Sequence, residues 1–474
     1  MVLRRRVVRA VLMSIAVILP VSFLAAGEKE TKLRILIAGA GHGGLVAAGH
    51  LAAAGYRVEV FERKVRSDMG WDWHDNLRYV SFRQAAVPDP PPQLYGRCSD
   101  FSFLSPDGKQ RLRTAMQLTE REIVMDRKKL LDYLIKFALD RGAVIHFGSE
   151  VKGPLLESGV VAGLLVGGKK HRASLVIDSA GMASPVRTSL PESYGILRRM
   201  GPGEVIHVYR AYYDIRDEVA LPLHDFPVHL MPLGIKGIAW VRVLERSSDV
   251  LVGSIDPLDR AAVDRVLAYL RRTYPGIGDK IVRGGRIARI PLRRPLPLLV
   301  GHNYAVLGDA AAMTVPVIGS GMENSMLAGR LLAETVIAVG AVAPHRGIWY
   351  HREDLWDYQY RFYRKAGARL CFLDRIKTFL LTEKPDRMNS YLRMKIVTAS
   401  DFQKPLLGQE VTVTGGEMFS RFLGAWYRPD LLLPLKSVLG EAARARDIAL
   451  EIPATWDESL FREWKRKLEE CYPR

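Results

Sequence analysis

The chain has 474 residues, enough for two or three domains, and a hydrophobic content of 48% that is ordinary for a globular protein. Its formal net charge of +18 at pH 7 suits an anionic membrane surface, an acidic substrate or merely a solvated basic surface. No RNP, zinc-finger or basic-zipper signature accompanies that charge, so we expect no nucleic-acid partner. The cysteines, Cys98, Cys371 and Cys471, are far apart and form no CxxC, which gives no support for a metal site, a protein-held iron–sulfur cluster or a disulfide framework.

Residues 1–29 have the pattern of a targeting segment. A basic run over 4–9 precedes an apolar stretch over 10–27, as in a signal peptide or a short membrane anchor. The adjacent arginines also resemble a twin-arginine export signal. The segment therefore leaves the location open: an exported protein, a membrane-anchored protein, or a cytoplasmic protein with a misassigned start.

A glycine-rich turn follows the first expected strand, which covers 33–37. The turn reads GAGHGG over 39–44, and an alanine-rich helix is expected over 45–55. Gly39 permits a tight turn, Gly41 lets the backbone approach a pyrophosphate, and Gly44 allows helix and strand to pack closely. The N-terminus of the helix offers free N–H groups and a positive dipole end to phosphates. This pattern predicts a dinucleotide site.

A second apolar strand over 58–61 ends at Glu62, roughly 20 residues after the glycine-rich turn. In such a fold, a carboxylate at this place binds the hydroxyls of a ribose. An acidic residue favours an unphosphorylated ribose, as in FAD or NAD, over that of NADP.

Beyond Glu62 the pattern leaves the dinucleotide fold. Residues 63–83 are polar and aromatic and contain the unusual string WDWHD over 71–75. A proline-rich bridge over 88–92 is followed by a hairpin over 101–114, a helix over 130–139 and a strand over 144–147. Residues 150–178 alternate like a small meander that ends in a buried strand over 175–177.

The second half opens with strands expected over 205–213, 228–231, 237–244 and 250–255, and with an amphipathic helix over 259–274. From Tyr304 a buried strand, a Gly308-Asp309 turn and a helix over 322–339 are expected, and then mostly helices from 344. An aromatic stripe over 349–363 indicates either core packing or a helix that seeks a membrane interface. No second GxGxxG follows a strand, so we expect no separate domain for a nicotinamide nucleotide.

Three motifs stand in one order along the chain: GAGHGG over 39–44, MDRKKL over 125–130, and VLGDAA over 306–311 with a Pro/Gly-rich stretch up to Gly321. This set resembles the p-hydroxybenzoate hydroxylase superfamily of FAD-dependent oxidoreductases, and within it the geranylgeranyl reductase and FixC-like branch, over about residues 32–345. The resemblance implies FAD as the cofactor.

The resemblance also implies which residues hold FAD. Arg127 would bind its phosphates, and Asp309 its ribityl chain. Gly319 and Gly321 would bring backbone N–H groups to the pyrimidine end of the flavin, where the following helix adds its dipole. The full set of predicted cofactor contacts is Gly39, Gly41, Gly44, Glu62, Arg63, Arg127, Gly308, Asp309, Pro316, Gly319 and Gly321.

The fold class that follows is α/β, with a Rossmann-like FAD-binding domain of the glutathione-reductase type, interrupted by a β-sheet substrate domain and followed by a helical C-terminal region. The predicted ranges are 1–29 for the signal-like or anchor segment, 30–76, 119–200 and 285–343 for the FAD-binding domain, 77–118 and 201–284 for the substrate domain, and 344–474 for the helical region.

The substrate side carries weaker signals. The superfamily's Asp-Gly motif appears as IDSAG over 177–181, with Ala180 where aspartate is usual, and Trp240 is what remains of the reductases' Tyr-x-Trp-x-Phe-Pro motif. Trp71, Trp73 and Trp240 are candidate substrate-lining residues. His74 and Asp75 are the candidate catalytic pair for proton transfer, and the alternative for His74 is a hydrogen-bonded structural histidine.

The main hypothesis is an FAD-dependent oxidoreductase that transfers a hydride between flavin and an apolar or amphipathic substrate, small or lipid-like, in the specific form an isoprenoid-type double bond. NAD(P)H is a candidate transient electron donor. The alternatives are a FixC-like electron-transfer dehydrogenase with a separate partner, a flavin monooxygenase, and a non-catalytic FAD-binding interaction protein at a membrane surface.

Overall fold

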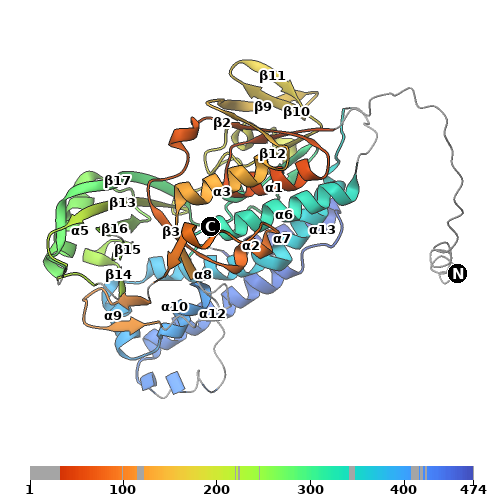
Figure 1. The fold of residues 1–474 in the computed structure, drawn as a ribbon. Coiled ribbons are helices and arrows are strands. Elements are labelled where there is room, and N and C mark those ends of the chain that lie inside the picture. The colour runs from red at the N-terminus through yellow and green to blue at the C-terminus, as the bar shows by residue number, and fades with distance from the viewer. Residues whose placement is uncertain are drawn as a thin grey trace, which may run out of the picture. The chain divides into compact units, whose positions relative to one another are not determined.

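The computed structural model describes residues 33–474, except 99, 115–121, 219, 223–224, 245, 341–346, 407–415, 417–419, 422–423 and 473–474 (Figure 1). The signal-like or anchor segment predicted over 1–29 lies outside the described residues. Among the helices that are described, none combines the length and the apolar character that crossing a bilayer requires.

A six-stranded sheet in the order β18-β19-β12-β1-β2-β8 forms the centre of the first domain. Its strands run parallel, except that β18 pairs antiparallel with β19. The bounds are Arg34–Ala38 for β1, Arg57–Glu62 for β2, Val144–Phe147 for β8, Leu175–Asp178 for β12, Val300–Gly301 for β18 and Tyr304–Val306 for β19. Strands β1 and β12 are almost wholly buried, as a parallel sheet covered on both faces requires.

Helices cover one face of this sheet and a small second sheet covers the other (Figure 1). The helices are α1 (His42–Ala53), α3 (Arg127–Leu139) and α6 (Met322–Val339), and the small sheet has the order β11-β10-β9, over Lys169–Arg172, Val160–Val166 and Val151–Glu157. Helix α1 begins at His42, three residues earlier than predicted. The arrangement confirms the predicted Rossmann-like fold and the meander.

The second large sheet of the structure has seven strands in the order β17-β13-β16-β15-β14-β5-β6. Its bounds are Phe101–Leu104 for β5, Arg111–Arg113 for β6, Val205–Ile215 for β13, Phe226–Leu230 for β14, Gly237–Leu244 for β15, Ser247–Ser254 for β16 and Ile277–Pro291 for β17. Alternate residues such as Tyr209, Ala211 and Tyr213 pack under helix α5 (Arg260–Thr273). The residues between them face the opposite side, because successive side chains of a strand alternate in direction.

Two parts of this architecture were not predicted from the sequence. Strand β17 carries Gly284 and Gly285 at φ +77° and +82°, and its register with β13 shifts there, so its alternating pattern is interrupted. A small sheet in the order β3-β7-β4 joins His74–Arg78, Glu122–Asp126 and Tyr95–Arg97, which are far apart in the chain. The small sheet brings the polar side chains of His74, Asp75 and Glu122 to the site described below.

The C-terminal region is helical, as predicted. It contains α7 (Arg352–Phe362), a turn of π-helix (Tyr363–Gly367), α8 (Ala368–Thr382), α9 (Pro385–Arg393), α10 (Ala399–Leu406), α12 (Pro429–Leu450) and α13 (Glu458–Glu469). Within the aromatic stripe, Trp356, Tyr358 and Tyr363 are buried, which favours core packing over an interface helix. Two short helices, α2 (Val80–Gln84) and α4 (Pro185–Thr188), lie in the first half of the chain. The domain boundaries stay a prediction.

Candidate active site

The glycine-rich turn has the geometry expected of a pyrophosphate cradle. Gly39 has φ +87°, and its N–H donates to the carbonyl of Phe61 at 2.8 Å. A Cβ on Gly41 would lie 2.8 Å from Ser179 Oγ, and one on Gly44 2.8 Å from Ser179 Cβ. The turn therefore leaves no room for larger residues on the side of Ser179, and the N–H groups at the start of α1 remain for a ligand.

Close packing of α1 against α6 depends on a further pair of glycines. A Cβ on Gly329 would lie 2.2 Å from the carbonyl oxygen of Gly43, a distance that only a backbone shift could relieve. This contact was not predicted, because nothing in the sequence pairs two residues so far apart. It fixes α6, and so the loop that precedes α6, relative to the glycine-rich turn.

The carboxylate of Glu62 is held by the backbone at the end of β2. Its oxygens accept hydrogen bonds from the N–H of Ala40 and the N–H of Lys64, each at 2.9 Å. The neighbouring Arg63 is exposed. Glu62 is thus fixed beside the glycine-rich turn, where a ribose hydroxyl would reach it.

Arg127, Asp75, His42 and Asp309 converge from four separate elements. Arg127 is the first residue of α3 and forms an ion pair with Asp75 of β3. Burial, aided by Arg127, lowers the pKa of His42 to about 3, and its buried Nε2 has no hydrogen-bond partner among the described residues. Burial raises the pKa of Asp309, and Arg127 opposes that shift. The guanidinium of Arg127, the ring nitrogen of His42 and the carboxyl group of Asp309 could therefore contact the same ligand.

These groups fit FAD. The N–H groups of the turn and the guanidinium of Arg127 suit a pyrophosphate, and the carboxylates of Glu62 and Asp309 suit ribose and ribityl hydroxyls. No described residue donates a hydrogen bond to the Asp309 carboxylate, which leaves it available to such a hydroxyl. Gly308 next to it has φ +66°, which a side chain would strain.

The loop before α6 closes the cofactor side of a large pocket. In this loop, Gly319 has φ +71°, its N–H donates to the carbonyl of Val315 at 2.8 Å, and Pro316 is buried. Gly321 is the N-cap residue of α6 and offers no side chain, so the first N–H groups of the helix stay accessible. The loop and the helix terminus are therefore placed to contact a flavin ring.

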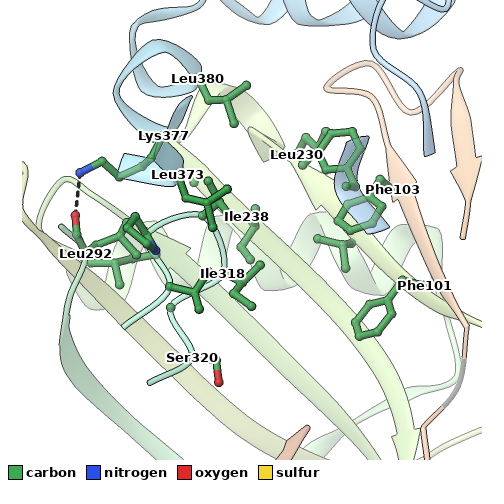
Figure 2. A pocket seen from close by; sticks show the side chains of 18 of the residues that line it. Phe101, Phe103, Leu230, Ile238, Leu292, Ile318, Ser320, Leu373, Lys377 and Leu380 are labelled. Carbon is green, nitrogen blue, oxygen red and sulfur yellow. Dashed lines mark hydrogen bonds between the residues drawn. The ribbon is translucent and has the colours of Figure 1, made fainter. Parts of the chain in front are cut away.

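We call the large cavity that begins at this loop the apolar pocket. It has an empty volume of about 2780 Å³, counted to its open mouth, and is lined mainly by aliphatic and aromatic side chains. In Figure 2, Leu373 of α8, Ile238 of β15 and Ile318 of the loop point into it, with Phe101 and Phe103 of β5 on the opposite side. It continues to Tyr391, Phe402, Leu435 and Leu439 of the helical region. The sheet residues that line it are those on the face turned away from α5.

The tryptophans occupy different places. Trp71 and Trp73 stack with ring centroids 4.8 Å apart, but only Trp73 reaches the apolar pocket. Trp240 also lines the pocket, and its Nε1 is buried without a hydrogen-bond partner in the described part of the chain. Its role as a substrate contact stays a prediction. Trp73 and Trp240 therefore line the cavity, whereas Trp71 stacks on Trp73 and does not line it.

The candidate catalytic pair, His74 and Asp75, lies at the wall of the apolar pocket. The ring of His74 is 3.3 Å from the hydroxyl of Tyr212. Burial alone would raise the pKa of Asp75, but Arg127 and Arg210 outweigh it and lower that pKa. An ionised carboxylate held by arginines is a poor proton donor, so this geometry favours a positioning role for Asp75. The catalytic assignment of the pair stays a prediction.

A different carboxyl group is suited to hold a proton. Glu122 of β7 lines the apolar pocket, and its Oε2 is buried without a hydrogen-bond partner among the described residues. Burial, reinforced by the nearby carboxylate of Glu323, raises the pKa of Glu122 to about 7. Arg78 holds Glu323 through its backbone N–H and its guanidinium, at 2.7 Å each. Sequence analysis missed Glu122, because only the β3-β7-β4 sheet brings it to the cavity.

A buried ion network supports the floor of the pocket. Asp249 of β16 is fully buried and accepts hydrogen bonds from Arg210 at 2.6 and 2.8 Å and from Arg242 at 2.9 Å. Burial alone would raise the pKa of Asp249, but these arginines lower it. Arg242 also donates to the side chain of Asn76 at 2.6 Å. The network ties the seven-stranded sheet to β3 beneath the pocket.

Comparisons with known proteins identify the family. A family model described as FAD dependent oxidoreductase matches residues 81–335, more than half of the chain, and one described as NAD(P)-binding Rossmann-like domain matches residues 37–76. The chain belongs to the FAD-dependent oxidoreductases. FAD is therefore its cofactor, and the protein is an enzyme, as the motif order predicted.

The chain is similar to curated proteins named digeranylgeranylglycerophospholipid reductase. It is 22% identical to that of Sulfolobus acidocaldarius over 455 residues, covering 93% of this chain and 97% of the relative. It is 26% identical to that of Methanoculleus marisnigri over 343 residues, covering 66% and 81%. These similarities agree with the resemblance to the geranylgeranyl reductase branch that the motif order indicated.

Solved structures share the fold. A geranylgeranyl bacteriochlorophyll reductase-like protein from Thermoplasma acidophilum matches with a TM-score of 0.68 at 17% identity, covering 86% of this chain and 99% of that one. A flavin-dependent brominase matches with a TM-score of 0.57 at 16% identity, covering 80% and 94%. Both confirm the predicted fold class.

Proposed function

We propose that this oxidoreductase saturates a carbon–carbon double bond in an isoprenoid-type lipid. The observation that carries the proposal is the apolar pocket, which runs from the loop before α6 between the seven-stranded sheet and α8 into the helical region. A long cavity lined by leucine, isoleucine and phenylalanine suits a polyprenyl chain. The names of the relatives support the same substrate class.

We assign the binding of FAD to the converging elements described above. The backbone of the glycine-rich turn and Arg127 would bind the pyrophosphate, and Glu62 and Asp309 the hydroxyls. Gly319 and Gly321 would face the flavin ring, with Gly308 and Pro316 shaping the same wall. When reduced, bound FAD supplies a hydride. The exposed Arg63 is the least supported of the predicted contacts.

Saturation of an alkene also needs a proton. The hydride and its electron pair add to one carbon, the π bond breaks, and the other carbon takes a proton from an acid. We propose Glu122 as that acid, because its burial holds the carboxyl group protonated up to about pH 7. The Glu122 carboxylate left behind would regain a proton from solvent. Glu323, Arg78, Arg242 and Cys98 are the titratable or charged groups that face it.

The test is a single turnover without oxygen. The purified holoenzyme is reduced by light and then mixed with a geranylgeranyl lipid, and both the flavin absorbance and the mass of the lipid are followed. We expect the flavin to reoxidise and the lipid to gain two hydrogen atoms per double bond. Reoxidation only by oxygen or by a quinone analogue would contradict the proposal and support the monooxygenase or electron-transfer alternatives.

We propose further that the substrate is taken from a membrane surface. Trp426 and Tyr427 are 65% and 61% exposed and lie just before α12, whose Leu435 and Leu439 line the apolar pocket. Aromatic side chains at that place suit an interface with lipid headgroups. Co-sedimentation with anionic vesicles should weaken in Trp426→Ser/Tyr427→Ser, and unchanged binding would contradict this part. NAD(P)H and a protein electron donor stay open as sources of the electrons.

A further inference from the structure

A second cavity, which we call the basic pocket, adjoins the apolar pocket. It has an empty volume of about 900 Å³. The charged residues of its lining are Arg78, Glu323, Arg330, Arg361, Lys365 and Arg369. Arg78, Glu323, Asn324 and Arg369 line both cavities, so the two share a wall near the start of α6.

The basic pocket carries an excess of positive charge. Arg78 is matched by Glu323, with Nη2 and Oε2 2.6 Å apart. Arg330 and Arg361 share the carboxylate of Glu334, and Arg330 Nε lies 2.6 Å from it. The second contact of Arg361, with Asp357, is longer at 3.4 Å. The lining as a whole has five cationic side chains and one carboxylate, and the further carboxylates of Glu334 and Asp357 still leave it with an excess of positive charge.

The remaining cations come from an irregular stretch of helix. Arg361, Lys365 and Arg369 are spaced four residues apart, and the turn of π-helix over Tyr363–Gly367 lies between the first and the last. Lys365 is exposed and forms no ion pair with any residue that the structure describes. A π-helical turn is rare and is often retained at functional sites. Here the turn lies beside the basic pocket, which Arg361, Lys365 and Arg369 line.

We propose that the basic pocket binds the phosphate group of a phosphate ester whose remainder reaches the apolar pocket. Two or more guanidinium groups beside an ammonium group match the charge and the oxygen geometry of a phosphate. The shared wall joins this anion site to a hydrocarbon site, as an amphipathic ligand requires. As a statement about the substrate, the inference rests on the proposed function. The phosphate of a pyridine nucleotide would use the same contacts, and the experiment separates the two sources.

The variant to test is Lys365→Gln/Arg369→Gln, with Lys365→Gln alone as a milder form, since Lys365 is exposed. The matched control is Arg364→Gln, which removes a cation of the same π-helical turn that is exposed and does not line the pocket. All are used as holoenzymes. The light-reduced enzymes are reoxidised without oxygen by geranylgeranyl phosphate or by geranylgeraniol, and in a second arm the oxidised enzymes are reduced by NADPH or NADH.

We expect the double variant to lose about tenfold or more in kcat/KM for the phosphate relative to the alcohol, and the control to keep the wild-type ratio of the two. If the loss appears only in reduction by the nucleotides, the site still binds a phosphate ester, and the ester is the nucleotide. Equal rates of variant and wild type in both arms would overturn the proposal.

Binding is also measured independently of turnover. Inorganic pyrophosphate should raise the melting temperature of the wild-type and Arg364→Gln holoenzymes but not that of the double variant. If the wild type reduces neither lipid yet shows this shift, the proposed function fails while the anion site stands. If it reduces both lipids and the shift is absent or is the same in the double variant, the proposed function stands and the anion site is wrong.

Discussion

Replacing Glu122 by glutamine should change both the pH dependence of stability and the rate of alkene reduction. Burial and Glu323 raise the pKa of Glu122 from 4.5 to about 7 in the folded protein. The folded state therefore binds this proton more tightly than the unfolded state. The free energy of unfolding that this tighter proton binding contributes is fully present below the pKa of Glu122 in the unfolded state. It is lost as the pH rises through the pKa of Glu122 in the folded state. The total loss is about 3 kcal/mol between roughly pH 4.5 and pH 7.

Glu122→Gln keeps the shape of the side chain but cannot ionise, so this loss should disappear. Urea denaturation of the holoenzymes near pH 5 and near pH 8 measures it, and Glu458→Gln, an exposed glutamate of α13, is the control. The rate of flavin reoxidation by an alkene should fall by about 100-fold in Glu122→Gln, as expected for loss of a general acid. The wild-type rate should itself decline above about pH 7, since the acid is then ionised.

The reasoning is refuted by a Glu122→Gln variant that keeps both the wild-type rate and the wild-type pH profile. A variant that loses activity but keeps the pH dependence of stability would instead show that another group titrates near neutral pH. In that case the raised pKa does not belong to Glu122, and His74 returns as the candidate acid.

Other substitutions test the remaining parts of the site. Asp309→Ala should lose FAD, because no other predicted contact replaces its carboxylate; stoichiometric flavin absorbance in the purified variant would contradict the assignment. Asp249→Asn leaves the buried Arg210 and Arg242 without their shared charge and should cost about 3–5 kcal/mol, measured as a lower melting temperature with the fold retained. Leu373→Trp should narrow the apolar pocket and raise KM for a long isoprenoid about tenfold while sparing a short one, and equal effects on both would show that the chain does not pass this residue.

The motifs that surround the cofactor could be found in the sequence because each depends on short-range geometry. Gly39 and Gly41 stand in one turn between adjacent elements, so spacing alone reveals their role. The same holds for Glu62 at the end of the next strand. The order of the motifs then added Arg127 and Asp309, and with them the cofactor and the enzyme class.

Strand β17 and the β3-β7-β4 sheet could not be found in this way. Their pairing depends on partners many residues away, and paired glycines interrupt the alternation of β17. The packing of Gly329 against Gly43 is likewise invisible to any local pattern. The periodicity of a sequence predicts one helix or strand at a time, whereas these contacts join separate helices and strands.

The sequence by itself determined the Rossmann-like fold, the FAD chemistry and the family, because these depend on local turns and on their order. Only the tertiary structure decided which side chains share a cavity. In the folded chain, Asp75 forms an ion pair with Arg127, and Glu122 lies near Glu323. The basic pocket shares a wall with the apolar pocket. The physical reason is that charge and burial act through space, so the ionisation and role of a side chain depend on neighbours that the order of the residues does not reveal.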